Sequence, residues 1–270
     1  METLNRNWRG RNLKQKVVDL LRTDDFDWAL EIFCSFPARR VINPLFSLLC
    51  STEPQIRWRA ITATGAVVAN HASQDMESAR VLMRRMIWNL NDESGGIGWG
   101  LPEAMGEIMA RHEGLALGYA HILASYIRED GCFLEHPPLQ RGVLWGLGRL
   151  AQSRPELLND VPFHLRPFLT SEDATLRALA ARLFGLLGGG ESYPEMKDLL
   201  EDETEVTIYL HGTQQVRRVR DLAEEALATS GVANELAENA GDFKPGKVKS
   251  KTPSTKSETN ANDQSTKFNT

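Results

Sequence analysis

The sequence predicts an all-α protein, a right-handed α-solenoid of about five helix pairs. The main evidence is a repeat, because four segments align without gaps and each carries a glycine nine positions after an aliphatic first residue. A period near 40 residues with helical patterning is typical of stacked two-helix units. A hydrophobic content of 41% is enough for the continuous core of such a stack. The segments start at Ile56, Ile97, Leu139 and Leu176, which lie 41, 42 and 37 residues apart.

Caps and prolines place the individual helices. Asn12 can cap the first helix, and Pro37 and Pro54 can each begin one, since a missing N–H does little harm in a first turn. Pro102 falls equally early in the helix that follows the connection after Leu90. The expected helical regions are 12–51, which forms an irregular first repeat, then 54–69, 74–90, the helix that starts near 97, 114–128, the helix that starts near 139, 155–169 and 171–187.

The periodicity changes to two near the end of the chain. Residues 205–210 alternate, His211-Gly212 supplies a turn, and the chain runs back to Val219, which predicts a β-hairpin over 205–219. A helix over 220–228 follows. Because terminal repeats are atypical, we expect the hairpin and this helix to cap the open end of the solenoid. The solenoid domain is thus expected to span residues 1–230, with residues 231–270 as a disordered polar tail.

The repeat helices resemble a known family. Leu176-Arg177-x-x-Ala180 and Leu183-Phe184-Gly185-x-Leu187 look like the second helix of HEAT repeats, including the bacterial PBS-lyase-like subtype. The resemblance covers about residues 40–190 and implies a HEAT/armadillo-like fold, which serves many purposes. The stretches 90–103 and 133–142 also resemble an uncharacterised bacterial family of HEAT-repeat proteins, the DVU0298-like family, and no activity comes with that resemblance.

Composition excludes several classes of protein. A net charge of −5 argues against a basic nucleic-acid binder. The three cysteines are far apart and lack CxxC spacing, which favours a reducing cytoplasm and argues against a metal cluster. The chain has no apolar signal core and no run long enough to span a membrane. We therefore expect a cytoplasmic protein without a cofactor, and its oligomeric state stays open.

Helical phase predicts a groove. At about 100° per residue, the aliphatic positions of the aligned segments fall on one side, while positions 2, 6, 9 and 13 fall on the other. In HEAT-like stacks the second helices line the concave surface. Trp58, Trp99 and Trp145 are then expected to stand exposed in a groove floored by glycine and alanine, as at binding surfaces. The alternative is that the indoles pack against the neighbouring ridge.

Charged residues lie between these tryptophans. Glu103, Arg141 and Arg182 fall on the same side of the helices and can orient a polar ligand. The alternative is that they neutralise one another, with Glu103 and Arg141 forming an ordinary ion pair between repeats.

Two loops belong to adjacent repeats and are therefore expected to be neighbours beside the groove. Both precede helices, where free N–H groups and the helix dipole favour anions. Capping by Asp92 or Ser94, with Glu93 complementing the dipole, is the simpler explanation. A metal site is an alternative, but its spacing matches no known motif and we expect none. One loop carries Asn91, Asp92, Glu93 and Ser94, the other carries Glu135 and His136, and the metal alternative uses Asp92, Glu93, Glu135 and His136.

The resulting prediction is a non-catalytic scaffold that binds a protein or peptide partner in its concave groove. Trp99, Trp145 and the loops 91–103 and 135–141 would make the contacts. The alternative is an enzyme or ligand-binding protein acting on a nucleotide, a nucleic-acid base or a tetrapyrrole. HEAT-like alkylpurine DNA glycosylases place tryptophans and a carboxylate in a concave cleft, which Trp99, Glu103 and Trp145 resemble loosely, and the tetrapyrrole follows only from the PBS-lyase-like label.

Overall fold

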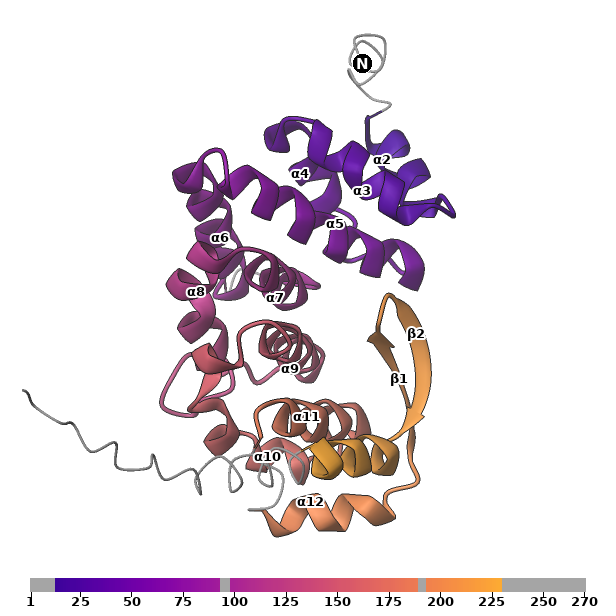
Figure 1. The fold of residues 1–270 in the computed structure, drawn as a ribbon, viewed down its shortest axis with the longest axis vertical. Coiled ribbons are helices and arrows are strands. Elements are labelled where there is room, and N and C mark those ends of the chain that lie inside the picture. The colour runs from indigo at the N-terminus through magenta and orange to yellow at the C-terminus, as the bar shows by residue number, and fades with distance from the viewer. Residues whose placement is uncertain (1–12, 93–97, 189–192, 230–270) are drawn as a thin grey trace, which may run out of the picture.

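The computed structural model describes residues 13–92, 98–188 and 193–229, and it confirms an all-α solenoid with a small hairpin near its C-terminal end (Figure 1). Four inner helices follow one another along the curved molecule, and each packs against the next. This row forms the side of the stack on which the candidate site lies. Its helices are α5 (Pro54–Ala72), α7 (Leu101–Arg111), α9 (Pro137–Ala151) and α11 (Ala174–Leu186).

A second row of helices covers the outer side of the stack. Here α6 packs on α5 and α8 packs on α7, as in two-helix repeats, while α2, α3 and α4 gather around α5 as the irregular first repeat. No helix in the described ranges combines the length and the hydropathy needed to cross a membrane. The bounds are α2 (Leu13–Arg22), α3 (Phe26–Ser35), α4 (Ala38–Phe46), α6 (Met76–Leu90) and α8 (Glu113–Ser125).

The prediction of a single helix over residues 155–169 is wrong. Pro162 and Pro167 interrupt the segment, because a proline inside a helix removes one hydrogen bond and clashes with the carbonyl four residues earlier. The short turns that form instead still bury Leu158 and Phe168 in the core. They are η2 (Pro155–Leu158), η3 (Val161–His164) and α10 (Arg166–Leu169).

The aligned glycines lie between helices and do not floor a groove as predicted. Each of the four faces the next helix of the inner row, where a side chain would collide. A Cβ on Gly65 would lie 2.7 Å from the Cβ of Glu107, and one on Gly106 would overlap the backbone of Gly146. The repeated glycine is thus a signal for close approach of successive repeats. The four are Gly65, Gly106, Gly148 and Gly185.

The predicted hairpin forms with the expected turn. Strand β1 (Glu205–Leu210) pairs antiparallel with β2 (Thr213–Arg218), so that Leu210 is opposite Thr213. Both turn residues have positive φ, 49° at His211 and 81° at Gly212, as a two-residue type I′ turn requires. The hairpin follows α12 (Pro194–Asp198) and η5 (Leu199–Glu201).

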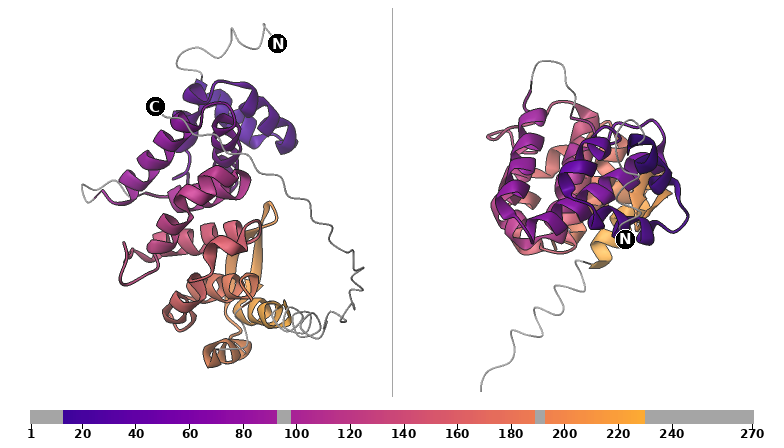
Figure 2. Two further views of the ribbon diagram at one scale, coloured as in Figure 1. Left: turned by 60° about the vertical axis from the view of Figure 1, so that its left-hand side comes forward. Right: turned by 90° about the horizontal axis from the view of Figure 1, so that it is seen from above.

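The hairpin does not cap the open end of the stack. Residues 219–229 are helical and continue the inner row, because Ala226 lies against Gly185 of α11. The hairpin instead runs along the inner side from α11 toward α5 (Figures 1 and 2). An isolated two-stranded sheet is marginally stable in water, and the inner helices provide the apolar surface on which it packs.

Candidate functional site

The hairpin covers two of the three tryptophans that helical phase places on the inner side. The Trp58 and Tyr209 rings stack, with centroids 4.5 Å apart and planes 4° from parallel. The Trp145 Nε1–H donates a hydrogen bond of 2.7 Å to the carbonyl oxygen of Tyr209. As a result, Trp58 is 9% exposed and Trp145 is 7% exposed. The prediction that both stand open in a groove is wrong, because a strand of the same chain fills that space.

Trp99 differs from the other two because it is not on a helix. Helix α7 begins at Leu101, and its N-cap Gly100 has a φ of 75°, so helical phase does not place Trp99. Its ring meets the His136 imidazole edge-on, with centroids 5.3 Å apart. This contact joins the turn before α7 to the residue before α9. Trp99 remains partly exposed.

A buried carboxylate lies in the first turn of α7. Glu103 is 3% exposed and accepts a hydrogen bond of 2.5 Å from Arg57 of α5 through Oε1. Its Oε2 is buried and has no hydrogen-bond partner among the described residues. Burial raises the pKa of the Glu103 carboxyl, and the Arg57 guanidinium opposes that shift. The site therefore contains an acceptor whose hydrogen-bonding capacity is only half used.

Arg141 forms its ion pair with a different residue from the one considered in the sequence. Its Nη2 lies 2.5 Å from Oδ2 of Asp173, the N-cap of α11. The alternative of a Glu103–Arg141 pair is thus wrong. Asp173 also accepts from the N–H groups of Thr175 and Leu176, which fixes its carboxylate at the helix terminus. The Arg141 side chain is consequently held at the edge of the site while remaining exposed.

These side chains line one hollow of about 190 Å³ between the inner helices and the hairpin, called the Trp99 hollow from here on. It is smaller than the roughly 300–1,000 Å³ of sites that enclose a small molecule. It has room for one or two side chains of another protein. The solenoid contributes Arg57, Trp58, Trp99, Glu103, Pro138, Arg141, Gly142, Trp145, Thr175 and Leu179, and the hairpin contributes Thr207, Ile208, Tyr209 and Gln214.

Among the described residues, the other loop candidates Asn91, Asp92, Glu135 and His136 do not line this hollow. Asn91 is the C-cap of α6, and Asp92 follows it. Glu93 and Ser94 lie outside the described residues. Glu135 and His136 precede α9 and are exposed. Across residues 13–92, 98–188 and 193–229, no group of three or more His, Cys, Asp or Glu side chains is arranged to hold a metal ion.

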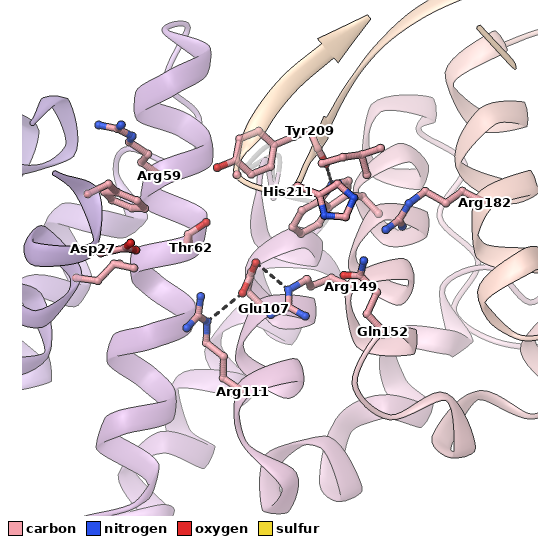
Figure 3. A pocket seen from close by; sticks show the side chains of 15 residues that line it. Asp27, Arg59, Thr62, Glu107, Arg111, Arg149, Gln152, Arg182, Tyr209 and His211 are labelled. Atoms are coloured by element: carbon pink, nitrogen blue, oxygen red, sulfur yellow. Dashed lines mark hydrogen bonds and ion pairs between the residues drawn. The ribbon is translucent and has the colours of Figure 1, made fainter. Parts of the chain in front are cut away.

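Arg182 lines a second and larger cavity of about 500 Å³, between the hairpin tip and the middle of the inner row (Figure 3). Trp145 and Tyr209 line both hollows and lie at their common boundary. We call this second one the arginine cavity. Its polar lining consists of Asp27, Arg59, Thr62, Glu107, Arg111, Arg149, Gln152, Arg182 and His211.

Two of these arginines share one carboxylate. Glu107, which is buried in α7, accepts from Arg111 Nε at 3.0 Å and from Arg149 Nε at 3.1 Å. Figure 3 shows the two arginines approaching Glu107 from different sides. Sequence reasoning missed this cluster. The signal was present, because Glu107 and Arg149 each directly follow an aligned glycine, and opposite charges at equal positions of neighbouring repeats predict an ion pair.

Comparison with known proteins agrees with the repeat assignment. The family model for a HEAT-like repeat matches residues 137–187, which comprise α9 through α11. A search of curated protein sequences gives no match. The segment from α9 to α11 therefore matches a HEAT-like repeat, and α5 and α7 pack in the same succession before it.

Solved structures are similar to this chain at low sequence identity. An engineered protein is 17% identical, with 82% of this chain and 97% of that chain covered and a TM-score of 0.46. A designed armadillo repeat protein is 16% identical, with 80% and 98% covered and a TM-score of 0.44. Another, in complex with the peptide (KR)4, is 15% identical, with the same coverage and a TM-score of 0.44. The assignment of the fold rests on the helix packing and the matched repeat.

Proposed function

We propose that this protein is a non-catalytic scaffold that binds a segment of a protein partner on the inner side of its solenoid, at the Trp99 hollow. The observation that carries the proposal is the composition of that hollow, which gathers three tryptophans, a tyrosine and two arginines from segments far apart in the sequence. Tryptophan, tyrosine and arginine are the residue types in which the binding energy of protein interfaces is concentrated.

The hairpin covers some of these residues and leaves others accessible to a partner. Trp58 and Trp145 are held beneath Tyr209 and form the inner wall of the hollow. Trp99 and Arg141 are accessible at its edge. Of the two tryptophan contacts expected from the sequence, the one at Trp145 is closed off and the one at Trp99 stays open, so the partner segment lies beside the hairpin.

The test compares two tryptophan variants of the full chain. Trp99→Ala removes the accessible indole of the hollow, whereas Trp88→Ala removes one that is 66% exposed on the outer helix α6. Loss of a central aromatic contact costs roughly 2 kcal/mol or more, which is about thirtyfold in affinity. We expect proteins captured from cells of the source organism, measured by quantitative mass spectrometry, to be lost with Trp99→Ala and retained with Trp88→Ala. An identical set of captured proteins for both variants would count against the proposal.

A further inference from the structure

The arginine cavity has a charge opposite to that of the whole molecule. Four guanidinium groups line it, from Arg59, Arg111, Arg149 and Arg182, against the two carboxylates of Asp27 and Glu107. The chain as a whole carries a net charge of −5. An excess of positive charge inside a concave, partly enclosed space focuses the field and attracts anions.

The internal bonds leave part of this charge uncompensated. Arg111 and Arg149 both donate through Nε to Glu107, so that one carboxylate serves two cations. Arg59 uses its Nη1 on the carbonyl oxygens of Leu21 and Thr23, which are neutral acceptors. Within the described part of the chain, the terminal amino groups of Arg149 thus have no hydrogen bond to a side chain and remain available as donors.

Arg182 differs from the other three arginines in its bonding. It forms no hydrogen bond or ion pair with any residue in the described ranges. Burial lowers the pKa of Arg182, Glu225 opposes that shift, and the like charge of Arg149 adds to it. In Figure 3 its guanidinium points into the space beneath His211, on the same side as Arg149. A partly buried cation that forms no hydrogen bond or ion pair destabilises a fold, and an anion bound in the cavity would compensate it.

We propose that the arginine cavity binds a phosphate-bearing small molecule, whose phosphate group is held between Arg149 and Arg182 beneath the hairpin tip. Guanidinium groups match phosphate oxygens with paired, charge-assisted hydrogen bonds. The volume of about 500 Å³ exceeds that of a bare phosphate and lies within the range of sites for small organic ligands. Thr62 and Gln152 offer neutral hydrogen-bonding groups for the rest of such a molecule. The proposal does not depend on the Trp99 hollow.

Isothermal titration calorimetry of the full chain at low salt tests this site, with inorganic phosphate, pyrophosphate and adenosine triphosphate as probes. We expect binding that weakens about tenfold or more in Arg182→Gln, because a charged hydrogen-bond donor is lost. Arg182→Lys keeps the positive charge but lacks the planar guanidinium group. Its affinity for the probes is expected to lie between those of the parent and of Arg182→Gln. Arg166→Gln is the matched control, since it removes the same charge from an exposed position outside the cavity, where Arg166 pairs with Glu195.

The outcomes separate the possibilities. Equal affinity for phosphate and adenosine triphosphate would identify free phosphate as the ligand, whereas tighter binding of adenosine triphosphate would identify a phosphate ester, and both support the site. Absence of binding by all three probes at millimolar concentration overturns it, as does an equal loss in Arg166→Gln. Thermal unfolding without ligand completes the test. Arg182→Gln is expected to melt at the same temperature as the parent or higher, and a large decrease would assign Arg182 a structural role instead.

Discussion

Glu103 illustrates at the residue scale how burial and an ion pair act in opposite directions on one group. The carboxylate is desolvated at the start of α7, where Arg57 and the helix dipole favour its charged form. Burial nevertheless dominates, and the pKa of Glu103 is raised above its ordinary value of 4.5. The protein environment therefore favours the protonated form of Glu103 more than water does.

This direction makes the stability dependent on pH. A group whose folded-state pKa is raised contributes stability that is present below its unfolded pKa and lost as pH rises through the folded pKa. We expect the free energy of unfolding of the parent to fall relative to Glu103→Gln as pH rises above about 4.5. Urea unfolding at several pH values measures this difference in stability. Parallel curves of stability against pH for the parent and Glu103→Gln would contradict the prediction. Glu77→Gln should change the profile in the opposite sense, because the hydrogen bond from Arg84 lowers the pKa of Glu77.

At the scale of elements, helices and hairpin could be predicted because their signals are local. Apolar periodicity, Pro54 and the His211-Gly212 turn each act within a few residues, and the structure has α5, β1 and β2 where these signals place them. The segment 155–169 failed for an equally local reason, since Pro162 and Pro167 outweigh its apolar pattern. The glycine repeat was visible, but its role was not, because the sequence does not show which helix lies opposite.

Two glycine substitutions, one at the contact of α7 with α9 and one away from it, test this close packing. Gly106→Ala would place a methyl group in the backbone of Gly146 and should destabilise the protein by about 1–3 kcal/mol. Gly118→Ala in the exposed part of α8 meets nothing within 4 Å and should stabilise it by up to about 1 kcal/mol, through helix propensity. Urea unfolding monitored by circular dichroism compares them. Two changes of the same sign would contradict the assigned contact.

At the scale of the whole molecule, the hairpin changes how the solenoid holds together. In most repeat proteins each unit contacts only its neighbours, so that stability is nearly a sum of local terms. Here Tyr209 of β1 contacts Trp58 in the first regular inner helix and Trp145 in the third. The sequence could not reveal this contact or the two hollows beside it. Alternation shows which strands pair, but it does not show the surface on which the sheet lies.

Removing the Tyr209 ring should therefore weaken the coupling between the two ends. We expect Tyr209→Ala to cost about 3–5 kcal/mol and to separate the unfolding transitions seen by tryptophan fluorescence and by circular dichroism. Val216→Ala on the exposed strand β2, where Val216 is 63% exposed, should change stability by less than about 0.5 kcal/mol and leave the transitions coincident. Coincident transitions in Tyr209→Ala would show that the repeats cooperate without this contact.

The order in which the chain is made gives the hairpin another consequence. Trp145 obtains its hydrogen-bond partner from a residue 64 positions later in the chain. During synthesis α5 and α9 therefore emerge before β1 and β2, and their indoles stay uncovered until the hairpin has also left the ribosome. A nascent or truncated chain that stops before β1 therefore exposes the Trp58 and Trp145 rings that the hairpin covers in the folded protein.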